Sequence, residues 1–322
     1  MTPLRVAVMG CADIAARRVL PAIARSDQVE LVAVASRDAA KAEATARPYG
    51  CRPVHGYRRL LEDPEVEAVY LPLPCALHAD WVEASLLAGK HVLAEKPLTP
   101  EPERTAALFA LAHERGLALM ENIMFLHHPL HATVSGLVAQ GFIGEPRSFR
   151  AEFTVPRRPA GDIRYQSALG GGALLDTGVY PLRAAIQLLG AELTTVAATL
   201  VRGPGFEVDT GGAAVLRTPE GVIVQLAFGL DHGYRSAYEL AGTHGRISVD
   251  QAFTPPADHE PVLRLEQRSG TEERRSPAHD QVASTLAAFA RAAAAGRSPD
   301  AHLSMRLAAL LHDVREHAGG PS

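Results

Sequence analysis

Strand-like and helix-like segments alternate through about the first 120 residues, and this alternation restricts the fold more than any other feature. The strand-like segments are short apolar runs, and a helical segment ends at Gly89, a usual position for a terminating glycine. Strands that alternate with helices pair in parallel, so the sequence predicts an α/β domain with a doubly wound parallel sheet. The predicted strands are residues 4–9, 30–36, 66–71, 91–94 and 117–121, and the predicted helices are residues 14–26, 38–49, 78–88 and 101–114.

The second part of the chain has strands in series. Strands that follow one another without intervening helices favour antiparallel pairing, so we expect an α+β domain with an open, mostly antiparallel sheet. The predicted strands are residues 147–155, 195–202, 213–217, 222–230, 237–241 and 262–267, and the predicted helices are residues 129–140, 173–189, 280–295 and 303–317. We expect residues 1–122 to form the first domain and residues 123–322 the second, with the C-terminal helices packing back on the first.

Length, charge and cysteine content exclude several classes of protein. A chain of 322 residues exceeds one ordinary core, and a net charge of -4 gives no reason to expect a nucleic acid or an anionic membrane as partner. No apolar run reaches the roughly 18 residues of a membrane span, and a strand begins too early for a signal peptide to precede it. Cys11, Cys51 and Cys75 have neither disulfide nor zinc spacing. We therefore expect a reduced, cytoplasmic protein.

The turn after the first predicted strand has the spacing of a dinucleotide-binding fingerprint. Gly10, Ala12 and Ala15 stand where that fingerprint has its glycines or small residues, directly between a strand and a helix. Such a turn brings backbone N–H groups and a helix N-terminus against a pyrophosphate, as in a Rossmann domain. The alternative is an ordinary strand-to-helix turn. The residues expected to contact the cofactor here are Gly10, Cys11, Ala12, Asp13 and Ile14.

The end of the second strand indicates which dinucleotide binds. An NAD site usually has an acidic residue here, whereas this chain has Ser36 and Arg37. A hydroxyl and a guanidinium suit an anionic 2′-phosphate, so we predict NADP(H). Asp38 follows and would repel a phosphate if it pointed inward. The alternative is that Ser36 caps the next helix and Arg37 is solvated.

The loops after the third and fourth strands complete the predicted cofactor site. Prolines restrict the third loop, which we expect to pack against the nicotinamide end, while His78 has packing or helix capping as an equal alternative. At the fourth loop, Glu95 and Lys96 lie where open α/β sheets bind ligands, and Pro97 restrains Lys96. A surface salt bridge is the alternative there. The predicted contacts from the two loops are Leu71, Pro72, Leu73, His78, Glu95 and Lys96.

An acid and a phenol follow a glycine run in the second part of the chain. Asp176 and Tyr180 are four residues apart on a predicted helix and so share a face. Reduction of a ketone requires a proton donor and a group that stabilises negative charge. An ammonium such as Lys96 lowers a phenol pKa from about 10, which makes Tyr180 a plausible donor. Lys96 as the direct donor is the rival assignment, and a half-buried packing tyrosine is the structural alternative. Asp176 would hold Lys96 or a sugar hydroxyl.

These segments together resemble the glucose-fructose oxidoreductase/inositol dehydrogenase family, also called Gfo/Idh/MocA. The resemblance implies a catalytic or positioning role for Lys96, a cofactor contact at Asn122 and a substrate contact at Phe125. Most of the family has histidine where Tyr180 stands. A tyrosine is similar to the nucleotide-sugar 3-ketoreductases, which implies an NADPH-dependent reduction at C3 of a dTDP-linked 3,4-diketo-2,6-dideoxyhexose. The matching stretches are residues 10–15, 71–74, 88–97, 121–125, 128–129 and 171–180.

A basic segment and a histidine cluster invite two further interpretations. Several guanidiniums before the glycine run suit the diphosphate of a nucleotide sugar, although a solvated loop is an equal alternative. The residues expected to bind substrate there are Arg157, Arg158, Arg164 and Tyr165. His127, His128 and His131 have no cysteine or acidic residue to complete a zinc spacing, so no metal is predicted.

Two other functions compete with the ketoreductase. A dehydrogenase of free sugars or inositols is disfavoured by Tyr180 and by the Ser36-Arg37 pair, and a non-catalytic NADP-sensing regulator is disfavoured by Lys96 with Tyr180. The resemblance also implies a homo-oligomer, dimer or tetramer, formed through the C-terminal sheet, which would otherwise expose apolar surface. The sequence leaves open the face of the sugar that is reduced, the nucleotide, the final product and the number of subunits.

Overall fold

The computed structural model describes residues 2–319. Contacts within the chain divide it into two compact units. The first unit comprises Met1–Ile123 and Val282–Met305, and the second comprises Met124–Gln281 and Arg306–Ser322. Residue 1 and residues 320–322, at the outer limits of the two expected domains, lie outside the described residues.

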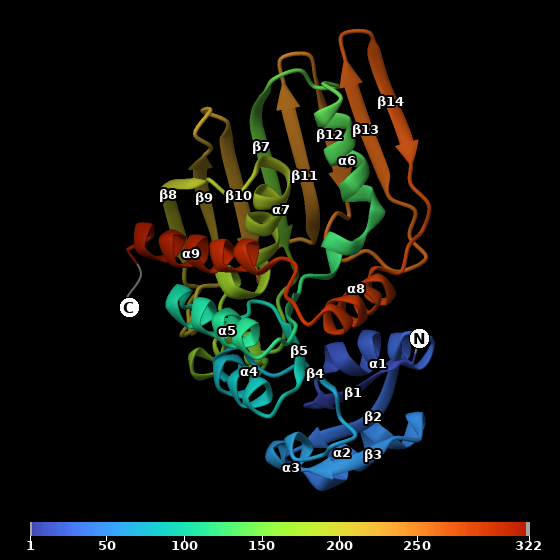
Figure 1. The fold of residues 1–322 in the computed structure, drawn as a ribbon. Helices are drawn as coiled ribbons and strands as arrows, with labels where there is room; N and C mark the ends of the chain where they lie inside the picture. Colours follow the sequence, from blue (N-terminus) through green and yellow to red (C-terminus); the bar gives the residue numbers. More distant parts are fainter. Residues whose placement is uncertain (1, 320–322) are drawn as a thin grey trace. The chain divides into compact units, whose positions relative to one another are not determined.

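A six-stranded parallel sheet forms the centre of the first unit, with the strand order β3-β2-β1-β4-β5-β6 (Figure 1). The order reverses between β1 and β4, and sheets of this type bind ligands beyond the strand ends at such a reversal. The predicted doubly wound parallel sheet is therefore confirmed. The strands are β1 (Leu4–Met9), β2 (Val29–Ser36), β3 (Arg52–His55), β4 (Ala68–Leu71), β5 (His91–Glu95) and β6 (Leu119–Asn122).

Apolar burial on both faces stabilises the central strands of this sheet. Every residue of β4 is buried, as are the last four residues of β1 and of β2. Parallel strands covered on both faces are continuous apolar runs, which explains why the sequence pattern located them. The surrounding helical segments are η1 (Ala15–Val19), α1 (Leu20–Ala24), α2 (Ala39–Ala46), η2 (Arg47–Tyr49), α3 (Tyr57–Leu61), η3 (Cys75–Leu77), α4 (His78–Leu87), α5 (Pro102–Glu114), most of α8 (Gln281–Ala295) and the start of α9 (Ala301–His317).

Two parts of the first unit differ from the sequence prediction. Residues 14–26 were predicted as one α-helix, but a π-helical segment, η1, precedes α1. Pro21 has no N–H group to donate to an earlier carbonyl, and a wider turn before it accommodates the ring. Strand β3 and helix α3 were not predicted; β3 contains Pro53, and three of its four residues are exposed.

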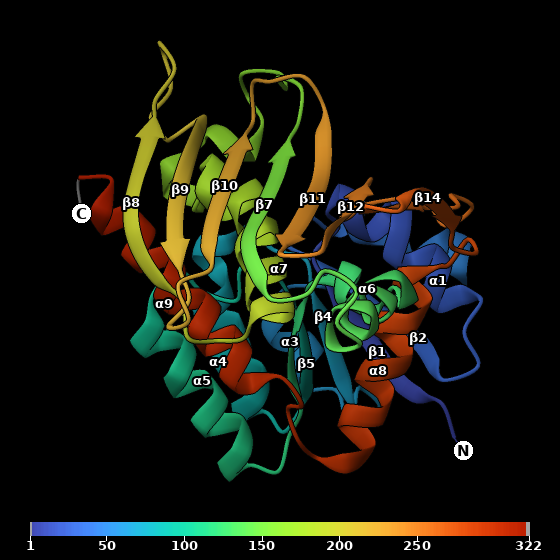
Figure 2. The same cartoon turned by 90° about the horizontal axis from the view of Figure 1, so that it is seen from above.

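An eight-stranded sheet forms the second unit, with the order β14-β13-β12-β11-β7-β10-β9-β8 (Figure 2). All neighbouring strands are antiparallel except β7 and β10, which are parallel. The predicted open, mostly antiparallel sheet is therefore confirmed. Its strands are β7 (Pro146–Thr154), β8 (Thr194–Val201), β9 (Gly211–Arg217), β10 (Ile223–Gly229), β11 (Arg235–Gly242), β12 (Gly245–Asp250), β13 (Val262–Gln267) and β14 (Gly270–Arg275).

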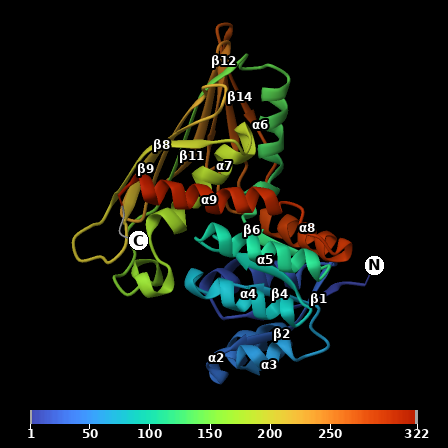
Figure 3. The same cartoon turned by 60° about the vertical axis from the view of Figure 1, so that its left-hand side comes forward.

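Side chains alternate between the two faces of this sheet. On β10, Val224, Leu226 and Phe228 are buried, whereas Ile223 and Gln225 are exposed. Helices α6 and α7 lie on the same side of the sheet (Figure 3), and α7 packs against β7 and β10. Strands β12 and β14 were not predicted: every residue of β14 is exposed, so it has no burial pattern, and β12 has only two buried positions. The other helical segments are η4 (Met124–His127), α6 (Pro129–Ala139), η5 (Ile163–Tyr165), η6 (Ser167–Leu169), η7 (Leu174–Gly178) and α7 (Val179–Leu189).

None of the described helices combines the length and the apolar character that a membrane crossing requires.

Candidate active site

The turn after β1 requires glycine for two independent reasons. Gly10 has a φ of 117°, a backbone conformation that residues with a side chain rarely adopt. A Cβ at Gly10 would lie 2.8 Å from Cδ2 of Leu73, so the loops after β1 and β4 are in close contact. Helical hydrogen bonding begins directly afterwards, because the Ala16 N–H donates to the Ala12 carbonyl at 3.1 Å. This arrangement is the tight turn and helix start that a pyrophosphate site needs.

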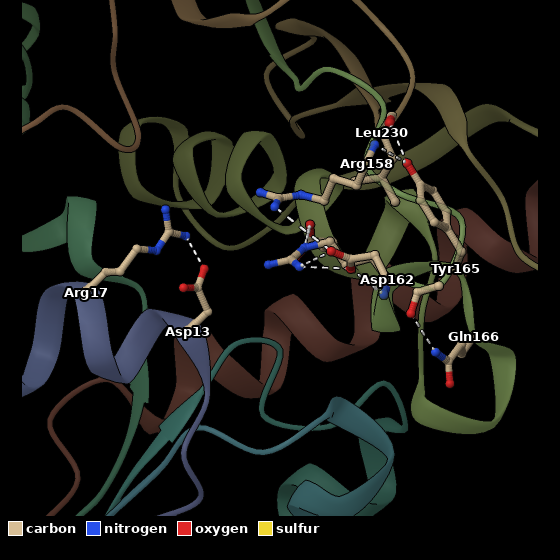
Figure 4. Close-up of polar contacts among 10 residues, drawn as sticks. Asp13, Arg17, Arg158, Asp162, Tyr165, Gln166 and Leu230 are labelled. Atoms are coloured by element: carbon tan, nitrogen blue, oxygen red, sulfur yellow. Dashed lines mark hydrogen bonds and ion pairs between the residues drawn. The ribbon is translucent and has the colours of Figure 1, made fainter. Parts of the chain in front are cut away.

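Asp13 lies at the start of this helical segment and is paired within it. Its exposed carboxylate forms an ion pair with Arg17, one turn further along (Figure 4). Cys11, Ala12 and Ile14 are partly exposed, as predicted cofactor contacts must be.

At the end of β2, the side chains of Ser36 and Asp38 each accept a backbone hydrogen bond near the start of the next helix. The Ser36 Oγ accepts a hydrogen bond from the Asp38 N–H at 3.2 Å, and the Asp38 carboxylate accepts one from the Lys41 N–H at 3.1 Å. Asp38 is therefore the N-cap of α2. Arg37 and Asp38 are both exposed at this strand end, and the Asp38 carboxylate is engaged by the helix.

Tyr57 is a neighbour of Arg37 that the sequence analysis did not identify. Burial raises the pKa of the Tyr57 phenol, while the charge of Arg37 and a hydrogen bond from it act in the opposite direction. The nearby Cys11 thiol raises the pKa of this phenol further. The turn after β1, the end of β2 and α3 therefore converge around Tyr57, and no motif in the sequence indicates this.

The strand ends that precede Lys96 are tied together by one carboxylate oxygen. Glu95 Oε1 accepts a hydrogen bond of 2.7 Å from the Tyr70 hydroxyl and one of 2.6 Å from Asn122 Nδ2. These three residues stand at the ends of β4, β5 and β6, so the predicted residues Glu95 and Asn122 are brought together, and Tyr70 joins them. Lys96 follows directly, is partly buried, and is joined to Pro97 by a cis peptide bond.

His78 is fully enclosed by backbone. Its Nδ1 is 2.9 Å from the Pro97 carbonyl oxygen and its Nε2 is 2.8 Å from the Leu73 carbonyl oxygen. Burial lowers the pKa of this imidazole, although both carbonyls favour the protonated form. His78 therefore links the loops after β4 and β5, which agrees with the packing interpretation and leaves direct cofactor contact as a prediction.

In the second unit, an arginine holds the predicted acid. Arg164 Nε donates to Asp176 Oδ2 at 2.9 Å, and its Nη1 donates to Asp162 Oδ1 at 3.0 Å. Burial lowers the pKa of the guanidinium, but the two carboxylates outweigh it and the pKa is raised. Arg164 was predicted to bind a diphosphate; the structure engages it with two carboxylates of its own unit.

Asp176 and Tyr180 do not lie on a continuous α-helix. Asp176 belongs to the π-helical segment η7, and Tyr180 is the second residue of α7. Both side chains are partly exposed. The Tyr180 ring packs edge-on against Phe153, with 4.8 Å between ring centroids, and near Phe125 at 6.1 Å. Phe125, which was predicted to contact substrate, is only 1% exposed and forms part of the aromatic packing beneath Tyr180.

The glycine run before this segment serves the chain's own packing. A Cβ at Gly171 would lie 2.5 Å from the Arg164 carbonyl oxygen. Gly172 has a φ of 123°, and a Cβ there would collide with Oδ1 of Asp209. The close partners of both glycines are backbone and side-chain atoms of the same unit.

In the basic segment, residues 157–165, Tyr165 is buried and the other residues are partly or fully exposed. Tyr165 is 4% exposed, and its hydroxyl donates to the Leu230 carbonyl at 3.0 Å and accepts from the Arg158 N–H at 3.1 Å (Figure 4). This hydroxyl therefore anchors the segment. The Arg157 guanidinium stacks on Phe206, 4.9 Å from the ring centroid, and remains more than half exposed.

Comparisons with known proteins agree with this architecture. The model of the oxidoreductase family with an NAD-binding Rossmann fold (GFO/IDH/MocA) matches residues 4–123, and that of the GFO/IDH/MocA C-terminal domain matches residues 131–248. The dTDP-3,4-didehydro-2,6-dideoxy-alpha-D-glucose 3-reductase of Actinomadura kijaniata is 50% identical over 98% of this chain and 96% of its own length. An enzyme of the same name from Streptomyces violaceoruber is 52% identical over 98% and 95% of the two chains. The crystal structure of KijD10, a 3-ketoreductase from Actinomadura kijaniata, in complex with NADP and TDP-benzene, has a TM-score of 0.95, 50% identity and 98% coverage of both chains.

The histidines next to α6 are held by hydrogen bonds. His131 Nε2 lies 3.1 Å from the Ala252 carbonyl and must donate to it, so Nδ1 accepts from the Tyr238 hydroxyl at 3.0 Å. His128 Nδ1 accepts from the Leu130 N–H at 3.1 Å and caps α6. Within residues 2–319, no group of three or more histidine, cysteine or acidic side chains is arranged to hold a metal ion.

These histidines predict a loss of stability in acid. Burial lowers the pKa of His128 to about 4 and that of His131 to about 3, from the ordinary 6.5. As pH falls below 6.5, the unfolded chain takes up protons that these folded histidines do not, so the free energy of unfolding decreases. Each histidine contributes roughly 1.4 kcal/mol per pH unit, about 2 kcal/mol at pH 5.

Urea unfolding at pH 7, 6 and 5 measures this effect. His128→Asn retains a capping side chain but does not titrate, so its unfolding free energy should fall less steeply with pH than that of the wild type. The exposed His302→Gln is the matched control and should retain the wild-type slope. A wild-type slope in His128→Asn would show that His128 is not neutral in the fold.

Proposed function

The chain belongs to the GFO/IDH/MocA oxidoreductase family, and from this we propose that it uses NADPH to reduce the C3 ketone of a dTDP-linked 3,4-diketo-2,6-dideoxyhexose. The observation that carries this proposal is the 50% identity, over 98% of the chain, to a reductase of that substrate. The tyrosine at position 180, the residue type that a ketone reduction needs as a proton donor, supports it.

The residues of the first unit fit NADP(H). Gly10 forms a turn that a side chain would fill, the start of a helical segment follows it, and Arg37 is exposed at the end of β2. We propose that backbone N–H groups of residues 10–14 bind the pyrophosphate and that Ser36 and Arg37 bind the 2′-phosphate. When bound, NADPH supplies the hydride for the C3 carbon.

Residues of the chain would stabilise the negative charge that develops on the C3 oxygen and donate a proton to it. Hydride addition places negative charge on the C3 oxygen, and we propose that the Tyr180 hydroxyl donates the proton to it. Lys96 would stabilise the developing charge and lower the phenol pKa. In the rival assignment the Lys96 ammonium itself donates the proton. Asp176, whose Oδ2 is bonded to Arg164, would accept a hydrogen bond from a sugar hydroxyl or from Lys96.

The diphosphate of the substrate needs cationic partners. Arg157 and Arg158 each have one longer carboxylate contact, 3.6 Å to Asp231 and 4.0 Å to Asp162, but their side chains are more than half and more than a third exposed, so both guanidiniums are accessible to an anion. Arg164 is already bonded to two carboxylates. We therefore assign diphosphate binding to Arg157 and Arg158 and give Arg164 the role of orienting Asp176.

Turnover measurements test the function directly. NADPH oxidation should be rapid with the dTDP-linked diketo sugar, generated in place by a dehydratase, and absent with free sugars. Lys96→Ala should lose roughly 10²–10⁴-fold in turnover and keep its affinity for NADPH, because general acid and electrostatic effects are of this size. Tyr180→Phe should lose turnover as well if the phenol is the donor.

The exposed Lys41→Ala is the matched control and should turn over normally. Turnover of a free sugar or inositol, without reduction of the nucleotide sugar, would contradict the proposed function. Normal turnover in Lys96→Ala would remove Lys96 from the mechanism.

The preference for NADPH depends on Arg37. Arg37→Ala should weaken NADPH binding by roughly 10- to 100-fold, since hydrogen bonds to charged groups contribute about 1.5–3 kcal/mol, and should leave NADH binding nearly unchanged. Fluorescence titration of both cofactors measures this difference. Arg47→Ala, an exposed arginine of the same unit, is the control. An equal loss of NADH and NADPH affinity would contradict the 2′-phosphate assignment.

We further propose that the protein forms a homo-oligomer through the face of the second sheet that α6 and α7 do not cover. Val196, Val215 and Ile223 are 53%, 37% and 49% exposed on that face, and apolar side chains gathered on a sheet face are typical of a subunit interface.

Sedimentation velocity tests this arrangement. Val215→Asp with Ile223→Asp should convert the dimer or tetramer into a monomer, because each aspartate would bury a charge in the contact. Leu87→Asp, at an equally exposed leucine of the first unit, should not. A wild-type monomer would contradict the proposal.

We also propose a cytoplasmic location, since Cys11, Cys51 and Cys75 form no disulfide among the described residues. Recovery of the protein from the extracellular fraction of its host would contradict this.

A further inference from the structure

One acidic residue that has no part in the proposed chemistry lies at the start of the segment that carries Asp176 and Tyr180. Asp209 belongs to the connection between β8 and β9. Its Oδ2 accepts a hydrogen bond of 2.7 Å from the Leu174 N–H, and its backbone carbonyl accepts one of 2.8 Å from the Ala173 N–H. The first N–H groups of a helical segment have no partner within it, so Asp209 supplies two of the missing acceptors.

The fit around this carboxylate is close on its other side. A Cβ at Gly172 would collide with Asp209 Oδ1, and the φ of 123° at Gly172 also favours glycine. The Gly172 carbonyl accepts from the Asp176 N–H at 3.0 Å. The carboxylate, the glycine and the first turn of η7 therefore form one packed group, and any movement of Asp209 changes the position of residues 172–174.

The position of this first turn determines where the functional side chains point. Residues 173–180 are a continuous helical run, since the Thr177 hydroxyl donates to the Ala173 carbonyl at 3.0 Å and α7 begins at Val179. A rotation or shift at residue 174 is therefore transmitted to Asp176 and Tyr180. Arg164 restrains the Asp176 carboxylate from the side, and its carbonyl accepts from the Gly172 N–H at 2.9 Å, directly before the run.

The groups around Asp209 determine the charge state of its carboxylate. Burial raises its pKa, and the backbone N–H groups of the segment and the charge of Arg315 partly oppose this. These donors stabilise the partly buried carboxylate, which places a negative charge at the positive end of the helical run.

We propose that Asp209 is a positioning residue for the reduction: by accepting from the Leu174 N–H, it fixes the start of the run that presents Asp176 and Tyr180. It acts through that run and touches neither substrate nor cofactor. The inference rests on the proposed function for its kinetic consequence only.

Three variants test this role. Asp209→Ala removes the acceptor, and its kcat should fall by roughly 10- to 100-fold, a loss of about 1.4–2.7 kcal/mol of transition-state stabilisation, while the KM for NADPH changes by less than about 3-fold. Asp209→Asn retains an acceptor oxygen of the same size and should restore kcat to within about 3-fold of the wild type. Thr218→Ala is the matched control, because Thr218 Oγ1 accepts from the Val222 N–H in the turn between β9 and β10, and its kcat should not change.

Amide hydrogen exchange of residues 173–180, followed by mass spectrometry, provides a readout that does not depend on activity. Exchange should be about 10-fold faster in Asp209→Ala than in the wild type, in Asp209→Asn or in Thr218→Ala, because a fixed first turn protects the amides that follow it. Should Asp209→Ala fail to fold, Asp209→Ser, with its shorter acceptor, takes its place with the same expectation in smaller degree.

Unchanged exchange and unchanged kcat in the alanine or serine variant would overturn the proposal. An asparagine variant as impaired as the alanine one would also overturn it, because the acceptor would then not be the feature that matters. If the wild-type protein does not reduce the nucleotide sugar, the proposed function fails, and the exchange comparison alone still decides whether Asp209 holds the run.

Discussion

The site in the first unit depends on two hydrogen bonds to one oxygen atom. Glu95 Oε1 accepts from Tyr70 and from Asn122; Glu95 and Asn122 end β5 and β6, and Tyr70 is the last but one residue of the neighbouring parallel strand β4. Parallel strands of one sheet end on the same edge, so a shared acceptor there fixes the strand ends relative to one another. Lys96 follows Glu95 in sequence, and its backbone therefore starts from a fixed point. A lysine presented in this way loses less conformational entropy when it acts on a substrate.

In the second unit, an ion pair rather than hydrogen bonds from uncharged donors holds a candidate functional side chain in place. Arg164 holds Asp176 and Asp162 through a guanidinium whose side chain is 32% exposed, and such a partly solvated pair contributes little to the free energy of unfolding. Its value is orientation. A carboxylate that already has a directed partner does not reorganise when a sugar arrives, and preorganised groups stabilise a transition state more effectively than mobile ones. The orientation of the Asp176 carboxylate is thus set by the chain's own contacts.

The sheets could be predicted from sequence because burial leaves a pattern in it. β4 is buried at every position and β10 alternates, and these are the patterns of a doubly covered parallel strand and of a half-covered strand. β3 and β14 were missed for the same reason. β3 contains a proline and β14 exposes all of its residues, so neither buries enough apolar surface to be recognised. Both are edge strands, where hydrogen bonding to a single neighbour maintains the strand without help from the side chains.

The residues of the candidate site differ in how far the sequence could predict them. Lys96 and Tyr180 could be proposed as reactive groups because their chemistry is rare and their places at strand or helix ends are readable from local sequence. The residues that hold these groups in place could not be predicted. Tyr70 reaches Glu95 across 25 positions and Asp209 reaches Leu174 across 35, and no local pattern encodes a contact of that separation. The glycine run at 170–172 was the one local sign of such a support. Its glycines mark backbone that another part of the chain approaches closely, and only the folded structure shows that the approaching group at Gly172 is Asp209.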